Sequence, residues 1–236
     1  VVLRDANTII LGEGYAGLTL DVTAAGSITD TAGSSLYVYG ATTLTAQDGA
    51  TTFDIALDND VAADRHDFGG AVNAVGQDIT LIDRNGITLG AITTNGGAAD
   101  NTIDVDGGGE ATDPGALIVI ARGGAITQEM GNALTVTGDT TLEAADGAGG
   151  YFDIKLTNTA NAFDSDNADA AGDGNTQTDF VTFLGETVTI NDTGPFFVFD
   201  SVANAGGVLR VTVEREARTV SVSEITAMIE ETPIRS

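Results

Sequence analysis

Residues 26–46 have the sequence GSITDTAGSSLYVYGATTLTA, and residues 124–144 have the sequence GAITQEMGNALTVTGDTTLEA. The two stretches align without gaps at an offset of 98 residues (124 − 26 = 98), and 11 of their 21 positions are identical. Biased composition is a poor explanation for an ungapped match of this length. The chain therefore contains copies of one repeat, and such a period has to be identified before a fold is inferred.

The repeat extends on both sides of these stretches. VNAVGQDITLID at 72–83 aligns with VTFLGETVTIND at 181–192, at an offset of 109. The second copy is therefore longer, and its extra residues fall within 158–179, a stretch of Gly, Asp, Asn and Ala with almost no apolar content. This composition predicts a surface loop inserted between strands.

The opening residues also match the repeat, because ANTIILG at 6–12 resembles RNGITLG at 84–90. We therefore expect the chain to begin inside an earlier copy. The first residues, VVLRDANTII, carry no basic segment, apolar segment or cleavage site of a secretory signal, so we expect a removed signal or a fragment. The predicted organisation is the end of a preceding repeat (1–25), one repeat (26–123), a second repeat with an acidic loop insert at 158–179 (124–213), and a cap or junction (214–236).

The residue types predict an all-β chain. Thr, Val, Ile, Gly, Asn and Asp dominate the 236 residues, whereas the helix-favouring residue types Glu, Lys, Gln and Met are scarce. The strand-like segments are short and bounded by Gly, Asn and Asp. In FDIAL, for example, Phe53, Ile55 and Leu57 share one face, as a half-buried strand requires.

Two all-β architectures fit a repeat of this length. Apolar positions recur at intervals typical of one coil of a parallel β-helix (β-solenoid), which would give about ten to twelve coils and a rod of about 50 Å. The alternative is a pair of tandem immunoglobulin-like β-sandwiches. The chain has no Trp and only 6% aromatic residues, which favours the narrow solenoid.

Charge excludes several partners. With 35 acidic against 9 basic residues, the formal net charge is −26. No cluster of Lys and Arg can form a nucleic-acid footprint, and no apolar run approaches the roughly 18 residues of a membrane span. We therefore expect no nucleic-acid partner and no membrane span in this chain. The absence of Cys also excludes a disulfide framework and a thiolate nucleophile.

The last 30 residues differ from the rest. Residues 207–236 contain five acids and four Arg, and they predict strands near 208–213 and 219–222 followed by a short helix that Pro233 helps to end. One interpretation is a cap that covers the last coil and blocks aggregation at the open end. The alternative is a change of repeat or a junction to another domain.

No catalytic constellation is evident. His66 is followed by Asp67, but the chain has no G-x-S-x-G nucleophile motif, and we interpret His66 as a solvated loop residue. Paired Asp residues on a β-helix face could hydrolyse glycosides, which is the enzyme alternative, but the Tyr and Arg residues of a sugar site do not gather in sequence. We therefore predict a protein that is not an enzyme, without catalytic or cofactor-binding residues. Tyr37 and Tyr39 alternate with apolar residues and are expected to face solvent.

Calcium is the one metal that the Asp-rich loops suggest. The candidate stretches are 58–60, 104–106 and 164–175, and the candidate ligands in the last are Asp164, Asp166, Asp169 and Asp173. None of these stretches fits the EF-hand or the nonapeptide calcium repeat. Solvated turns that repel neighbouring molecules are therefore the main interpretation.

The pattern G-x-I-T-x-x-x-G-x-L-x-V-x-G-x-T-T-L at 26–44 and 124–142 resembles the filamentous-haemagglutinin-type repeats of large secreted bacterial adhesins. HDFGGAV at 66–72 resembles their N-D-F-x-G-x-V segment, with His66 in place of Asn, and the acidic insert is expected to displace this segment in the second copy. The resemblance covers roughly residues 1–213. It implies a right-handed parallel β-helix, exported by two-partner or autotransporter secretion to the surface of a Gram-negative bacterium.

The function that this resemblance implies is structural. We expect a non-catalytic shaft segment, extracellular or on the outer cell surface, in a protein that binds a host or matrix polymer or other cells. A self-assembling filament subunit is the further alternative, in which coils of separate chains stack on one another.

Overall fold

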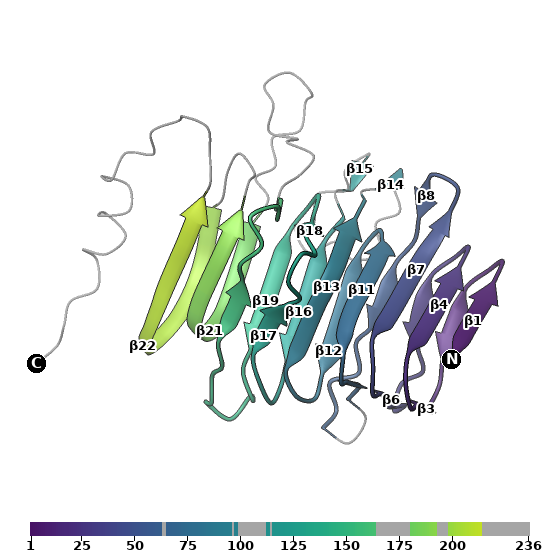
Figure 1. Cartoon of the computed structure of the whole chain (residues 1–236), viewed down its shortest axis with the longest axis horizontal. Coiled ribbons are helices and arrows are strands. Elements are labelled where there is room, and N and C mark those ends of the chain that lie inside the picture. The colour runs from purple at the N-terminus through teal and green to yellow at the C-terminus, as the bar shows by residue number, and fades with distance from the viewer. Residues whose placement is uncertain are drawn as a thin grey trace, which may run out of the picture.

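The chain folds as a right-handed parallel β-helix (Figure 1). The computed structural model describes residues 1–62, 65–95, 97–98, 112–113, 115–163, 180–192 and 198–213. The regular secondary structure assigned in these ranges consists of strands. None of the described residues forms a helix that could cross a membrane. Successive coils pair in parallel, which confirms the predicted solenoid. The sandwich alternative is wrong, because it needs face-to-face antiparallel sheets.

The first three coils have three sides, each a ladder of parallel strands, and the first two ladders continue into the fourth coil. The first side contains β1 (Val2–Asp5), β4 (Leu20–Ala24), β7 (Thr42–Asp48) and β11 (Ala71–Gly76). The second side contains β2 (Ile9–Leu11), β5 (Ile28–Asp30), β9 (Ile55–Leu57) and β12 (Ile79–Asp83). The third side contains β3 (Gly14–Ala16), β6 (Leu36–Val38) and β10 (Asp67–Phe68).

The later coils continue the first two ladders. The second side goes on through β16 (Leu117–Ala121), β19 (Thr140–Ala144) and the first halves of β21 (Phe180–Asp192) and β22 (Val198–Val213). The first side goes on through β13 (Ile87–Thr94), whose first half pairs with β17 (Ile126–Gln128) and whose second half pairs with β18 (Leu134–Thr135). The ladder from β17 then passes to β20 (Ile154–Leu156) and to the second halves of β21 and β22.

Two short antiparallel pairs lie outside these ladders. The end of β7 pairs with β8 (Thr51–Thr52), and β14 (Gly97–Ala98) pairs with β15 (Thr112–Asp113).

The two copies of the repeat do not stack side on side. Strand β7 of the first copy belongs to the first side, whereas its counterpart β19 belongs to the second side. The shift arises between β12 and β13, where residues 84–86 return the chain to the first side without a strand on the third side. Equivalent strands of the two copies therefore lie on different sides of the solenoid.

Aliphatic side chains fill the interior. In the first side the burial of β4 alternates along the strand, with Leu20, Val22 and Ala24 buried and the residues between them half-buried. Each coil places its inward residues on those of the next coil, so Val22 lies opposite Leu44, which is also fully buried. Burying one such Leu or Val side chain contributes about 1.5–3 kcal/mol. The coils are thus stabilised mainly by their neighbours along the axis.

Specific residues make the corners. Asp5 accepts the N–H of Asn7 at 2.8 Å, and Asp83 accepts the N–H of Asn85 at 2.6 Å, which are local turns of the Asx type. At another corner the backbones touch: a Cβ on Gly40 would lie 2.3 Å from the carbonyl oxygen of Leu18. A Cβ on Gly70 would meet the backbone of Gly40 at 2.5 Å. Glycine at these corners allows adjacent coils to approach closely.

Some predictions about length and ends reach beyond the described part of the chain. Nine strands stack on the first side of the described chain, from β1 to the second half of β22, whereas the prediction of ten to twelve coils covers the whole chain, including residues outside the described part. Some coils contain long loops: Thr42 and Val72, which pair across adjacent coils, are 30 residues apart (72 − 42 = 30). The strand predicted near 208–213 is confirmed within β22. The predicted cap at 214–236 lies outside the described residues.

Candidate functional site

Most of the predicted calcium candidates cannot be placed. Asp164, Asp166, Asp169 and Asp173, and the stretch 104–106, lie outside the described residues. The stretch 58–60 is described. In the part of the chain that the structure describes, no group of three or more His, Asp or Glu side chains is arranged to hold a metal ion.

Asp60 of that stretch contacts cations of its own chain. Its Oδ2 lies 2.6 Å from Nη2 of Arg122, and its Oδ1 lies 2.8 Å from Nε of Arg65. The hydrogen bond from Arg122 lowers the pKa of Asp60, while partial burial opposes the shift. Arg122 also forms an ion pair with Glu143. The cluster ties the loop after β9 to the second side at β16 and β19, so its role is to join coils.

His66 is buried, with 1% of its surface exposed, so the interpretation as a solvated loop residue is wrong. The N–H of Leu36 donates to Nδ1 of His66 at 3.1 Å, and Nε2 lies 2.6 Å from Oδ2 of Asp30. Because Nδ1 accepts a backbone N–H, the proton of the neutral ring lies on Nε2 and is donated to Asp30. We call Asp30 and His66 the first polar clamp, because the pair joins successive coils and satisfies the buried N–H at the start of β6.

The second copy contains the same clamp in uncharged form. Asn161 accepts the N–H of Leu134 at 3.0 Å, and Leu134 is the counterpart of Leu36. The amide of Gln128, the counterpart of Asp30, donates to the same oxygen at 2.6 Å and accepts the Asn161 amide at 3.2 Å. Gln128 and Asn161 are therefore the second polar clamp. An amide pair and an imidazole–carboxylate pair fill equivalent places in the two copies.

The second clamp lies within the stretch predicted to be an acidic surface loop. Asn161 and Phe163 are fully buried, so residues 161–163 belong to the solenoid, whereas Thr159 and Ala160 just before them are exposed. Asn161-Ala162-Phe163 takes the place of His66-Asp67-Phe68, so the start of this segment is kept in the second copy, and the residues that follow Phe163 lie outside the described chain. The signal in the sequence was N-A-F at 161–163, which an alignment at a fixed offset of 98 or 109 misses, because His66 and Asn161 are 95 residues apart (161 − 66 = 95).

Asp83 is a further buried acid that the sequence did not single out. Its Oδ2 accepts the N–H of Phe68 at 2.7 Å, so it links β12 to the strand that follows His66. Burial raises the pKa of Asp83 to about 7, against the opposing effect of the two backbone N–H donors at Phe68 and Asn85. Asp83 therefore titrates near neutral pH within the solenoid wall.

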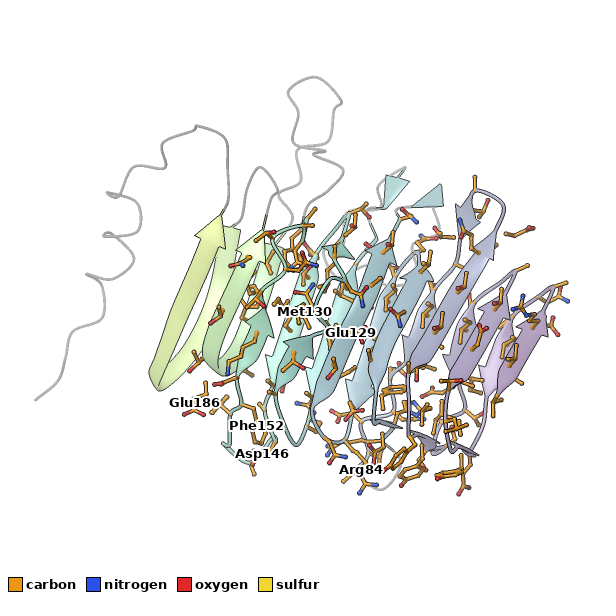
Figure 2. The ribbon with its side chains drawn as sticks, in the orientation of Figure 1. Arg84, Glu129, Met130, Asp146, Phe152 and Glu186 are labelled. Atoms are coloured by element: carbon orange, nitrogen blue, oxygen red, sulfur yellow. The ribbon has the colours of Figure 1, made fainter. Side chains whose placement is uncertain are left out.

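Tyrosines line the third side. Leu36 and Val38 point into the core, whereas Tyr39 is 74% exposed, which confirms the predicted alternation in this strand. Tyr15 pairs with Tyr37 across adjacent coils. The guanidinium of Arg84, at the lower edge in Figure 2, lies 5.6 Å from the Tyr37 ring centroid and donates to its hydroxyl at 2.9 Å. These contacts also run between coils.

Comparison with known proteins identifies the repeat. The profile of a family described as "Repeats of unknown function (DUF5649)" matches residues 1–75 and 98–169. The chain belongs to this family. The two matched stretches of the DUF5649 chain begin 97 residues apart (98 − 1 = 97), close to the internal offset of 98. No curated protein and no solved structure matches the chain.

Both matches contain a complete polar clamp. The first covers Asp30 and His66, and the second covers Gln128 and Asn161. In this chain the two DUF5649 matches thus join coils at equivalent positions with different pairs of side chains. The site residues found in the described chain connect coils to one another.

Proposed function

We propose that this chain is a non-catalytic shaft segment of a secreted bacterial surface protein of the filamentous-haemagglutinin type. In this proposal the shaft holds an adhesive region away from the outer surface of a Gram-negative cell. The adhesive region binds a host or matrix polymer or other cells. The observation that carries the proposal is that the two polar clamps, Asp30 with His66 and Gln128 with Asn161, tie coil to coil.

Three physical properties support a shaft. Parallel ladders run along the whole described stack, so a load along the axis is resisted by backbone hydrogen bonds between coils. The net charge of −26 favours solubility and repulsion between neighbouring rods. The lack of Cys means that no disulfide forms before the chain crosses the outer membrane.

The test is a display experiment on bacterial cells. The chain is placed between an outer-membrane anchor and a small domain of known ligand, and capture of ligand-coated beads is measured. Inserting a second copy of residues 26–123 is expected to increase capture, because the domain then extends farther from the cell. Deleting the same residues is expected to decrease it. A shaft without the domain should capture no beads.

Two results would contradict the proposal. Bead capture that is unchanged by the length of the shaft would remove the spacer role. Binding of the purified chain itself to host cells or matrix polymers would make the chain the adhesive part of its protein.

A further inference from the structure

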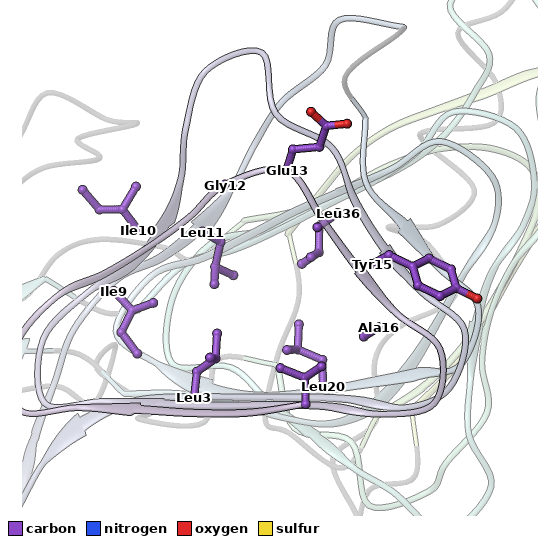
Figure 3. Close-up of a pocket in the computed structure, with 12 residues that line it drawn as sticks. Leu3, Ile9, Ile10, Leu11, Gly12, Glu13, Tyr15, Ala16, Leu20 and Leu36 are labelled. Carbon is purple, nitrogen blue, oxygen red and sulfur yellow. The ribbon is translucent and has the colours of Figure 1, made fainter.

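The N-terminal end of the solenoid is an open apolar face. Strands β1, β2 and β3 pair with the next coil along one edge. Figure 3 shows Leu3, Ile9 and Leu11 pointing into the interior at this end, around an open hollow of about 250 Å³. Leu3 is 37% exposed. We call the outer surface of residues 1–16 the end face.

The same face occurs a second time inside the molecule. Residues 1–12 align with residues 79–90 at an offset of 78, and 6 of the 12 positions are identical. Strand β12 pairs with β16 as β1 pairs with β4. The backbone bonds agree as well: the nitrogen of Val1 donates to the oxygen of Thr19 at 2.6 Å, and the nitrogen of Ile79 donates to that of Ala116 at 2.9 Å.

The internal counterpart of the end face is covered. Leu81, Ile87 and Leu89, which correspond to Leu3, Ile9 and Leu11, are all fully buried. Two strands of the preceding coil cover them: β9 pairs with β12, and β11 pairs with β13. The structure therefore contains both the open and the covered form of one surface.

Gly90 lies where the covering coil approaches closely, and its counterpart in the end face is also a glycine. A Cβ on Gly90 would lie 2.3 Å from Oδ1 of Asn73, a side chain of β11 that also accepts the N–H of Ala91 at 2.9 Å. The counterpart of Gly90 is Gly12, where a Cβ would meet nothing within 4 Å. Gly12 does not adopt a positive φ either. Neither space nor backbone conformation requires glycine at position 12 unless an Asn lies above it.

We propose that the end face is a docking surface for one further coil of the same repeat, built like residues 53–78 of this chain. The coil adds strands equivalent to β9 and β11 along the open edges of β1, β2 and β3. Its counterpart of Asn73 lies over Gly12 and accepts the N–H of Glu13. Its counterpart of His66 accepts the N–H of Ala6 through its carbonyl, as His66 accepts the N–H of Arg84 at 2.8 Å.

The last coil that the structure describes, β22, matches the end face less well than residues 53–78 do. In sequence, the first half of β21 aligns with β11 and the second half aligns with β12. The first half of β22 pairs with the first half of β21 as β13 pairs with β11. The second half of β22 pairs with the second half of β21 as β16 pairs with β12. In the part of the chain that the structure describes, the last coil is β22, and β22 of a second copy placed directly on the end face would present counterparts of β13 and β16. The end face requires counterparts of β9 and β11. The end face is thus matched by a coil that pairs as β9 pairs with β12 and as β11 pairs with β13, whether or not the chain serves as a shaft.

The test extends the chain at Val1 with a second copy of residues 53–78. The control extension has the same composition but exchanges the order of 53–60 and 71–78, so that its strands meet the wrong edges. Hydrogen exchange at the amides of Ala6 and Glu13 is the readout. The correct extension is expected to slow exchange by about tenfold or more, while the control leaves it unchanged.

Gly12→Ala provides a second readout. In the chain as it stands, this substitution should leave the exchange rates and the melting temperature unchanged. In the extended chain it should remove the added protection, and Asn73→Ala in the added copy of residues 53–78 should restore it.

Three outcomes would overturn the proposal. They are equal protection by both extensions, an extended chain that tolerates Gly12→Ala, and linear oligomers of the unextended chain in which Ala6 and Glu13 are already protected. None of these outcomes bears on bead capture by the displayed shaft, so this inference and the shaft role can fail separately.

Discussion

His66 and Asn161 accept equivalent backbone N–H groups, one with an imidazole nitrogen and the other with an amide oxygen. The two clamps can therefore be exchanged by design. His66→Ala should lower the free energy of unfolding by about 3 kcal/mol, because the N–H of Leu36 and the carboxylate of Asp30 lose a buried partner. The double substitution Asp30→Gln with His66→Asn copies the second clamp and should recover most of that loss in urea unfolding. A double variant as unstable as His66→Ala would show that the clamps are not equivalent.

The hydroxyls of Thr42 and Thr140 occupy equivalent buried positions in the two copies, and neither has a hydrogen-bond partner among the described atoms. Replacing either by Val removes an unsatisfied polar group at nearly constant volume. Each substitution should raise the free energy of unfolding by about 1 kcal/mol. Thr94→Val is the control and should destabilise, because the Thr94 hydroxyl donates to the carbonyl of Gly115 at 2.6 Å. Destabilisation by both Thr42→Val and Thr140→Val would point to hydroxyl partners that the static structure does not contain.

Asp83 makes stability depend on pH. Burial raises its pKa to about 7 in the folded chain, from 3.8 for an ordinary Asp. The folded state therefore binds the proton more tightly, so the stabilisation is fully present below about pH 4 and is lost as the pH rises through 7. From pH 5 to pH 8 the free energy of unfolding should fall by roughly 2–3 kcal/mol more in the unaltered chain than in Asp83→Asn. Urea unfolding of both proteins at the two pH values measures this difference. Parallel pH profiles for the two proteins would exclude a titration of Asp83 in this range.

The corner between β6 and β7 depends on the contact of two backbones. Gly40→Ala places a methyl group 2.3 Å from the carbonyl oxygen of Leu18, so the coils have to separate there. The expected loss is at least about 2 kcal/mol in the free energy of unfolding. Gly12→Ala adds the same methyl group in open space and should be neutral within about 0.5 kcal/mol. A tolerated Gly40→Ala would mean that the coil spacing at this corner adjusts easily.

The sequence identified the strands better than it identified the clamps. Alternation in segments such as FDIAL and LYVYG marks the inward side chains, and these predictions are confirmed by the burial of Ile55, Leu57, Leu36 and Val38. His66 was misjudged because its partners, Asp30 and the N–H of Leu36, lie one coil earlier and 30 or more residues away. Polar composition around 161–163 suggested solvent for a related reason. A solenoid wall can bury an Asn when the neighbouring coil supplies its hydrogen bonds.

The charge of the whole molecule predicts a response to salt. At a net charge of −26 the acidic side chains repel one another, and salt screens this repulsion. Raising NaCl from about 20 mM to about 500 mM should therefore raise the urea midpoint. The gain should be larger in Arg122→Gln, because Asp60 and Glu143 then lack the cation that lies between them. A midpoint that falls with salt would mean that ion pairs outweigh repulsion in this chain.

Other properties of the whole molecule could not be derived from the repeat. The sequence alignment identifies equivalent residues but does not say on which side of the solenoid they lie. That depends on residues 84–86, which return the chain to the first side without a strand on the third. The length of each coil could not be derived either: Thr42 and Val72, which pair across adjacent coils, are 30 residues apart because loop residues lie between their strands (72 − 42 = 30).

Because equivalent strands of the two copies lie on different sides, the outer surface of the rod differs from one copy to the next. Leu44 in β7 and its counterpart Leu142 in β19 lie on different sides of the solenoid. Outward residues at equivalent positions of the repeat therefore point in different directions around the axis. In a longer array with the same change of side from each copy to the next, the outward residues at one position of the repeat would form a spiral around the axis. Such a rod would present the same surface on all of its sides, because neither its charged residues nor its tyrosines would gather on one side.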